Sequence, residues 1–249
     1  MAARDRSVHV VDRGAWGAEP LLFVHGWGVS GAAFDAFFDR LAEHYRVIAP
    51  DLPGFGRSRA SRGAVSYAGY ADVLADVLDD LGIGRAHVAG LSMGGGIALS
   101  FAARHPERVR TLVLMAPTGC PEVSLARLAC NRMLELAEQA LSPGQARGNA
   151  LVARIFAGNL LRHPASLAAT IRMVASCSIL EEARRITAPT LLLWGARDRT
   201  IPPRLAAQFA ERLPDASLRV IADSFHQIAA AQPEHTAGII HDFISRANA

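Results

Sequence analysis

Residues 88–96 read VAGLSMGGG, and this stretch decides the fold of the chain. It places Ser92 between an apolar run and three consecutive glycines. The pattern G-x-S-x-G is typical of a sharp turn from a strand into a helix, where the residues two before and two after the serine must be small because a Cβ atom would collide with nearby backbone. We therefore predict a strand over 87–91, a strained turn at Ser92 and a helix over 93–104. A membrane span is the weaker interpretation, although residues 86–103 carry no Asp, Glu, Lys or Arg.

Strand-like and helix-like segments alternate along most of the chain. Short apolar runs favour strands, and apolar residues at helical spacing favour helices. The expected strands are 8–11, 20–24, 46–49, 87–91, 109–115, 189–195 and 217–221, and the expected helices are 30–44, 67–81, 93–104, 203–213 and 227–246. This alternation predicts an α/β fold, with parallel strands in one sheet and helices on both faces.

One long segment, 120–187, interrupts the alternation. It shows no strand pattern, only helix-like pieces broken by Pro121, Pro143 and Pro164. We expect it to form a helical insertion at one edge of the sheet, between core segments 1–119 and 188–249.

The composition restricts the classes of function. The chain has 249 residues, of which 51% are hydrophobic, and a net charge of +3, which is modest for a nucleic-acid-binding protein. All 26 basic residues are arginine, so no lysine can act as a Schiff base or phosphate clamp. The glycine-rich stretches lack phosphate-loop spacing. We therefore expect no nucleotide site and no nucleic-acid partner.

The cysteines and the first residues bear on compartment and metals. Cys120, Cys130 and Cys177 are too few for a disulfide framework and fit no zinc spacing. The first residues, MAARDRS, lack the apolar region of a secretory signal. We expect a cytoplasmic protein with no metal, no cofactor and no membrane span, in which the cysteines are small buried residues.

Five motifs in order carry a resemblance to the α/β-hydrolase family that covers nearly the whole chain. They are HGWG at 25–28, DLPGFGRS at 51–58, GLSMGG at 90–95, LLLWGARD at 191–198 and SFHQIAAAQPE at 224–234. The resemblance implies a mostly parallel sheet of the eight-stranded type, with helices on both faces and a small helical cap over the site. One residue departs from the family pattern, because Phe225 stands where glycine often precedes the histidine.

Ser92, Asp198 and His226 occur in the order that this fold uses for a nucleophile, an acid and a base. A serine hydroxyl needs a base to take its proton, and histidine can return that proton to a leaving group. An aspartate orients the imidazole ring. The rivals for these roles are expected to be turn or surface residues: Asp215, Asp223, His235 and His241.

An oxyanion hole needs two hydrogen-bond donors. We assign it to the backbone N–H groups of Trp27 and Met93. We place His25 beside the substrate pocket, as a hydrogen-bonding residue of the oxyanion loop rather than a base.

The predicted function is hydrolysis of a small or medium carboxylic ester, thioester or lactone through an acyl-enzyme. The serine at the turn excludes relatives with an aspartate nucleophile, namely haloalkane dehalogenases and epoxide hydrolases. A carbon–carbon bond hydrolase of a ring-cleavage pathway, an acyltransferase or perhydrolase, and a non-catalytic ligand-binding member of the fold remain open.

The cap is expected to set specificity, since it lines the acyl pocket in this fold. Met133, Phe156 and Met173 are candidates to face the substrate, although for each of them packing of the cap against the core is the simpler interpretation. The segment carries eight arginines and five glutamates. An arginine-bearing cap is similar to that of the pimeloyl-acyl-carrier-protein methyl ester esterases, so an acidic carrier protein is a possible partner. A solvated surface is the simpler interpretation of these charges.

Overall fold

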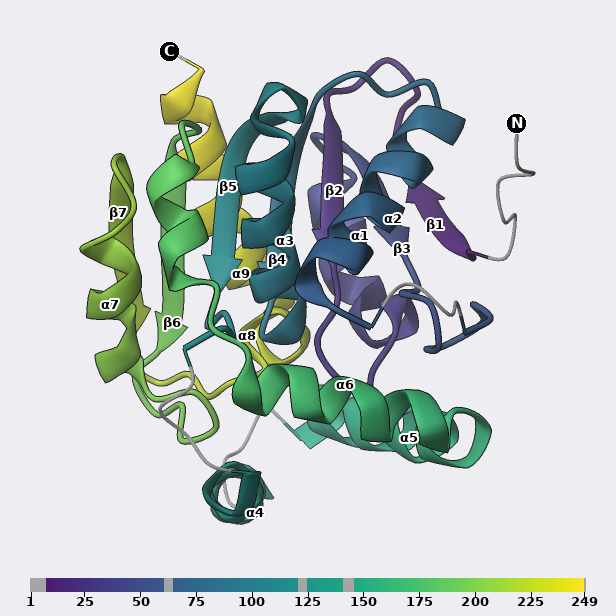
Figure 1. Ribbon diagram of the computed structural model, residues 1–249, viewed down its shortest axis with the longest axis vertical. Coiled ribbons are helices and arrows are strands. Elements are labelled where there is room, and N and C mark those ends of the chain that lie inside the picture. Colours follow the sequence, from purple (N-terminus) through teal and green to yellow (C-terminus); the bar gives the residue numbers. More distant parts are fainter. Residues whose placement is uncertain (1–7, 61–64, 121–124, 141–145, 249) are drawn as a thin grey trace.

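The computed structural model describes residues 8–60, 65–120, 125–140 and 146–248, whose strands form one mostly parallel sheet (Figure 1). The strand order is β1-β3-β2-β4-β5-β6-β7, and only β1 runs antiparallel to its neighbour. The strands are β1 (Val10–Arg13), β2 (Pro20–Val24), β3 (Arg46–Pro50), β4 (Ala86–Leu91), β5 (Val109–Met115), β6 (Thr190–Gly195) and β7 (Ala216–Ile221). The α/β prediction is confirmed. The described residues form seven strands of this sheet, with the four-residue β1 at one edge.

Helices cover both faces of the sheet, as the alternation predicted. One face carries α2 (Tyr67–Asp80), α3 (Met93–Arg104) and α7 (Ala206–Ala210), and the other carries α1 (Asp35–Leu41), α8 (Ile228–Ala231) and α9 (Pro233–Ala247) (Figure 1). The central strands β2, β4, β5 and β6 are almost fully buried. Continuous apolar strands are expected where both faces of a parallel sheet are covered.

Three predicted helices are interrupted in the structure. Residues 203–213 form a 3₁₀ turn, η4 (Pro203–Leu205), followed by the five-residue α7. Residues 30–44 form a 3₁₀ turn, η1 (Gly31–Phe34), followed by the shorter α1. Residues 227–246 divide into α8 and α9 at Pro233, because proline disfavours helical backbone in the preceding residue. Gln232 accordingly has φ −134° and ψ 62°.

The segment 120–187, named the cap segment from here on, lies between β5 and β6 and is helical where it is described. It contains α4 (Leu125–Ala140), α5 (Ala146–Arg162), α6 (Pro164–Ser176) and η3 (Leu180–Arg185). In Figure 1, α4, α5 and α6 lie across the carboxyl end of the sheet. This is the end at which open parallel sheets place their sites.

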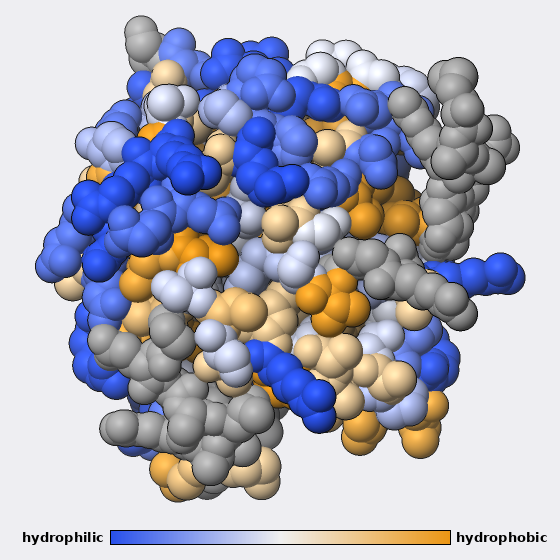
Figure 2. Space-filling model, in the orientation of Figure 1, coloured by the Kyte–Doolittle hydropathy of each residue, from blue (hydrophilic) through white to orange (hydrophobic). Residues whose placement is uncertain are grey.

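The surface of the cap segment differs from that of the core. Figure 2 shows hydrophilic side chains over much of the upper part of the molecule and more apolar ones towards the cap. Met133, Leu134, Leu160 and Leu161 are exposed on α4 and α5. Cys130 and Cys177 are also exposed, so the expectation that the cysteines are buried is wrong for these two, which lie on the outside of the cap segment.

Two kinds of feature are absent from the described residues. No helix in them is long and apolar enough to cross a membrane. No group of three or more His, Cys, Asp or Glu side chains in them is placed to hold a metal ion.

Candidate active site

Ser92 occupies a strained turn between β4 and α3, as its flanking sequence predicted. Its φ is 57° and its ψ is −119°, a conformation that costs a non-glycine residue about 1–3 kcal/mol. Three backbone hydrogen bonds hold it: its N–H donates to Met115 O (2.8 Å), and its carbonyl accepts from the N–H groups of Thr118 (3.0 Å) and Gly96 (3.1 Å). The turn places the serine at the carboxyl end of a central strand.

The glycines around Ser92 are required by close backbone approach. A Cβ atom on Gly90 would collide with the carbonyl of Gly94, and one on Gly94 would collide with the carbonyls of Val24 and His25. The G-x-S-x-G spacing is therefore a packing requirement between β2, β4 and α3.

Asp198 and His226 form a buried hydrogen-bonded pair. His226 Nδ1 lies 2.7 Å from Asp198 Oδ2, and each residue is 3% exposed. The other carboxylate oxygen, Oδ1, accepts the N–H of Ile201 at 2.7 Å. Burial raises the pKa of the Asp198 carboxyl, and the attraction of His226 opposes this shift. Because a carboxylate only accepts, Nδ1–H is the donor, which leaves Nε2 able to receive a proton.

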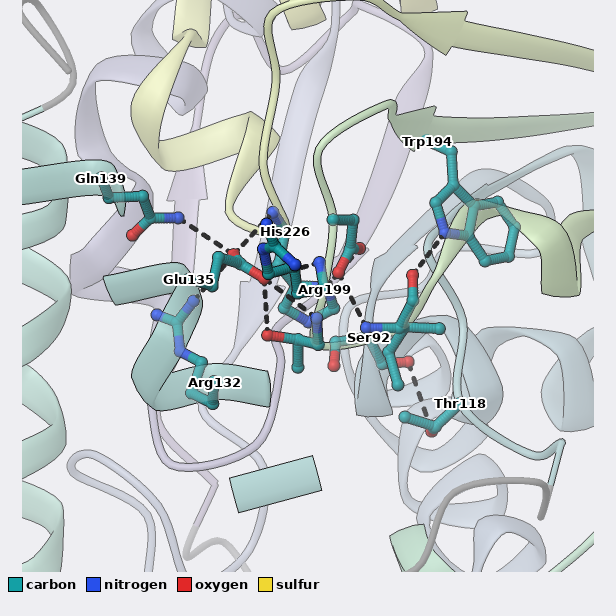
Figure 3. Close-up of polar contacts among 11 residues, drawn as sticks. Ser92, Thr118, Arg132, Glu135, Gln139, Trp194, Arg199 and His226 are labelled. Carbon is teal, nitrogen blue, oxygen red and sulfur yellow. Dashed lines mark hydrogen bonds and ion pairs between the residues drawn. The ribbon is translucent and has the colours of Figure 1, made fainter. Parts of the chain in front are cut away.

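Ser92, Asp198 and His226 all lie at the carboxyl end of the sheet. Ser92 follows β4, Asp198 follows β6, and His226 follows β7, three strands that all run in the same direction. A Cβ atom on Gly195, the last residue of β6, would collide with the carbonyls of Ser224 and Phe225. The turn with Asp198 and the loop with His226 therefore pack tightly (Figure 3).

The four rival residues are placed elsewhere. Asp215 precedes β7 and so lies at the opposite end of that strand from His226. Asp223 and His235 are exposed. His241 stacks on His44 with ring centroids 4.0 Å apart and contacts the Tyr45 hydroxyl at 3.1 Å.

The two expected oxyanion donors come from adjoining segments. Met93 is the first residue of α3, so its N–H has no acceptor within the helix. A Cβ atom on Gly26 would lie 3.4 Å from Cβ of Ser92, which places the segment that contains Trp27 beside the serine. The Trp27 indole N–H reaches Thr170 Oγ1 (3.1 Å) and Leu167 O (3.3 Å) on α6.

His25, placed beside the substrate pocket from the sequence, is buried and makes a contact at each ring nitrogen. Its ring is 1% exposed, its Nε2 accepts the N–H of Leu52 (2.9 Å), and its Nδ1 lies 2.9 Å from the Gly26 carbonyl. Burial lowers its pKa, which favours the neutral ring that this pair of contacts requires. His25 therefore joins the loop after β2 to the loop after β3, and its hydrogen bonds fit the prediction of a structural residue in the oxyanion loop.

The three candidate pocket residues in the cap segment lie in different surroundings. Phe156 packs on Trp27, with ring centroids 5.5 Å apart. Met173 is 5% exposed and belongs to the same apolar cluster as Met93. Met133 is 67% exposed on α4, so the structure does not enclose it with the other two.

Two buried polar residues of the cap segment were not singled out from the sequence. Asn159 on α5 donates to Gly28 O (3.0 Å) and accepts the N–H of Gly56 (2.8 Å), which joins the cap segment to the loops after β2 and β3. Glu135 on α4 is 0% exposed, so its interpretation as one of the solvated charges of the cap is wrong. No local pattern marks either residue as buried, since their backbone partners in the core are distant in sequence.

Residues 19–179 match the profile of the alpha/beta hydrolase fold family. The chain therefore belongs to the α/β-hydrolase family, as the five motifs indicated, and is a hydrolase of that fold.

Three relatives illustrate the range of that family. The chain is 30% identical to a pimeloyl-[acyl-carrier protein] methyl ester esterase of Aeromonas hydrophila, over 90% of this chain and 94% of the relative. It is 32% identical to a 2-hydroxymuconate semialdehyde hydrolase of Pseudomonas putida, over 92% and 88% of the two chains. Its structure is similar to that of a thermophilic esterase from Thermogutta terrifontis, with a TM-score of 0.80, 27% identity, and coverage of 97% and 94%. Esterases and a 2-hydroxymuconate semialdehyde hydrolase are thus both among its relatives.

Proposed function

We propose that the protein is a serine hydrolase that cleaves a small or medium carboxylic ester, thioester or lactone through an acyl-enzyme. The observation that carries this proposal is the 2.7 Å contact between His226 Nδ1 and Asp198 Oδ2. The contact lies at the carboxyl end of the sheet, where Ser92 occupies its strained turn. A buried acid bonded to one nitrogen of the histidine leaves the other nitrogen to serve a nucleophile. In this proposal Ser92, His226 and Asp198 are nucleophile, base and orienting acid.

Acylation begins when the Ser92 hydroxyl oxygen attacks the substrate carbonyl carbon. His226 Nε2 takes the hydroxyl proton as the new C–O bond forms, and Asp198 stabilises the resulting imidazolium. The N–H groups of Trp27 and Met93 donate to the oxyanion. The intermediate collapses as the bond to the leaving alcohol breaks, and His226 gives its proton to that alcohol.

Deacylation repeats these steps with water in place of the serine. His226 removes a proton from water, and the oxygen attacks the acyl carbon. Ser92 leaves with the proton returned by His226, and the carboxylic acid is released. No metal or cofactor takes part in these proposed reaction steps.

The test is hydrolysis of p-nitrophenyl esters from acetate to dodecanoate by the wild type and by Ser92→Ala. We expect the wild type to release p-nitrophenol and the variant to lose this activity. The chain length with the highest kcat/KM then measures the acyl pocket. Equal rates for the two proteins would exclude Ser92 as the nucleophile, and inactivity of both would exclude simple ester hydrolysis.

A second candidate is hydrolysis of a carbon–carbon bond. It is supported by the similarity to the 2-hydroxymuconate semialdehyde hydrolase, which is as strong as that to the esterase relatives. The discriminating measurement compares kcat/KM for 2-hydroxymuconate semialdehyde with that for the best p-nitrophenyl ester. A preference for the former would replace the ester proposal, with Ser92 still required.

The acyl acceptor is a separate part of the proposal. Water gives a hydrolase, whereas an alcohol or hydrogen peroxide gives an acyltransferase or perhydrolase from the same acyl-enzyme. Product analysis with added methanol or peroxide tests this choice, and we expect the free carboxylic acid to predominate. A non-catalytic ligand-binding protein would give no product with any acceptor.

An acidic carrier protein is the proposed carrier of the acyl group, by analogy with the pimeloyl-[acyl-carrier protein] methyl ester esterase relatives. The supporting observation is a set of exposed arginines on the cap segment: Arg154, Arg162, Arg172 and Arg185. Arginine-to-glutamate changes at these positions should lower turnover of a carrier-bound methyl ester and leave p-nitrophenyl ester hydrolysis unchanged. Unaltered turnover of the carrier-bound ester would exclude docking on this surface.

A further inference from the structure

Glu135 is an acidic side chain of the cap segment that is fully enclosed by protein. It lies on α4, and its exposed fraction is 0%, whereas its neighbours Met133 and Leu134 are 67% and 51% exposed. A buried carboxylate is costly unless it is hydrogen-bonded and paired. The hydrogen-bond partners of Glu135 therefore show what its buried carboxylate stabilises.

Six donors converge on the two oxygens of this carboxylate (Figure 3). Oε1 accepts from the His226 backbone N–H (2.9 Å), Gln139 Nε2 (3.0 Å) and Arg132 Nη1 (3.0 Å). Oε2 accepts from the backbone N–H groups of Arg199 (3.1 Å) and Thr200 (3.0 Å), and from the Thr200 hydroxyl (2.8 Å). All six partners donate, which matches a carboxylate because it only accepts.

The backbone partners belong to the two segments that carry Asp198 and His226. Arg199 and Thr200 directly follow Asp198, and the third backbone donor is His226 itself. These partners lie 64, 65 and 91 residues from Glu135 in the sequence. One carboxylate therefore ties the turn with the acid to the loop with the base.

We propose that Glu135 is a positioning residue that fixes His226 and Asp198 relative to each other. The inference rests on the proposed function of Ser92, His226 and Asp198. Glu135 acts through these residues and does not touch the substrate.

The geometry explains how the positioning works. Asp198 holds the ring of His226 at Nδ1, and Glu135 holds its backbone, so two fixed points define where Nε2 lies. Hydrogen bonds that involve a charged acceptor are stronger than neutral ones and keep both loops in place.

The first variant for the test is Glu135→Gln, which keeps the shape of the side chain. An amide presents one NH₂ group, which would face donors at either oxygen position, so some of the bonds must be lost. The matched control is Glu181→Gln, at an exposed position of η3 in the same cap segment. It removes the same charge, but its ion pairs are with Arg184 and Arg212, neither of which adjoins Asp198 or His226 in the chain.

For Glu135→Gln we expect kcat for the best p-nitrophenyl ester to fall about 10- to 100-fold, the loss typical of a displacement of about 1 Å in catalytic geometry. KM should stay within about twofold of the wild-type value, because substrate contacts are unchanged. Glu181→Gln should keep the wild-type kcat. A purely structural role would lower the melting temperature and leave kcat per folded molecule unchanged.

A covalent probe separates this inference from the proposed function. A fluorophosphonate forms a bond from phosphorus to the Ser92 oxygen and expels fluoride, with the serine proton taken by His226. Wild type should be labelled rapidly, Ser92→Ala not at all, and Glu135→Gln to the same final extent but more slowly. Labelling of Glu135→Gln at the wild-type rate would overturn the positioning role alone, whereas a wild type that is not labelled would overturn the proposed function.

If Glu135→Gln does not fold, Thr200→Val tests the same positioning role with a smaller change, because it removes only one donor to Oε2 of Glu135. We expect a smaller fall in kcat and in the labelling rate, again without a change in KM. Wild-type values of both rates for Thr200→Val would count against the proposal.

Discussion

The sharpest prediction concerns Asp198→Asn, because the structure dictates how the introduced amide must point. Oδ1 of Asp198 accepts the Ile201 N–H at 2.7 Å, so the amide oxygen must occupy that position. The NH₂ group then takes the place of Oδ2, which lies 2.7 Å from His226 Nδ1. Nδ1 becomes an acceptor, and the proton of the neutral ring moves to Nε2. His226 can then no longer accept the Ser92 proton.

The expected loss is large. A wrong histidine tautomer in a serine–histidine–aspartate triad lowers kcat by about 10⁴, which corresponds to about 5.5 kcal/mol of transition-state free energy. The assay is p-nitrophenyl ester hydrolysis, with the folded fraction checked by circular dichroism. The control is Asp223→Asn, which changes an exposed acid three residues before His226 and should leave kcat unchanged. If Asp198→Asn keeps kcat within about tenfold of the wild type, the base is not oriented by this carboxylate.

Two further predictions concern stability. Asn159→Ala should lower the free energy of unfolding by about 2–4 kcal/mol in urea titrations, because it leaves two backbone groups of the loops after β2 and β3 without their partner. The control Asn248→Ala, at an exposed position, should change this free energy little, and equal effects of the two variants would refute the explanation. Burial lowers the pKa of both His25 and His87 from 6.5, so the unfolded chain binds more protons than the folded one below about pH 6.5. Stability should therefore fall as pH falls from 7 to 5.5, by at most about 1.4 kcal/mol per pH unit for each histidine. In urea titrations at these two pH values, His87→Gln should show a weaker dependence than the wild type, and an identical dependence would exclude His87 as a source.

Most of the core fold could be predicted because its determinants are local. The strands of the sheet are short apolar runs, and α3 begins and ends at the predicted residues, Met93 and Arg104. The division of the last helix at Pro233 was missed, because apolar periodicity continues across it while the backbone does not.

The candidate site, too, could be predicted only in part from the sequence. The motifs located Ser92, Asp198 and His226 in chain order, and the structure brings Asp198 and His226 into contact. Their catalytic roles, and those of the Trp27 and Met93 N–H groups, stay predictions. Met133 illustrates the limit of helical pattern, since an apolar residue of an amphipathic helix can face solvent when little packs over it.

By itself, the sequence determined the strained serine turn, the alternation of strands and helices and the order of the motifs. These features follow from steric contacts and periodicities within a few residues of the chain. Only the tertiary structure decided that His25 joins two loops and that Asn159 and Glu135 are buried hydrogen-bonding centres. Their partners lie up to 131 residues away in the chain, so no local pattern distinguishes them from polar residues on a solvated surface.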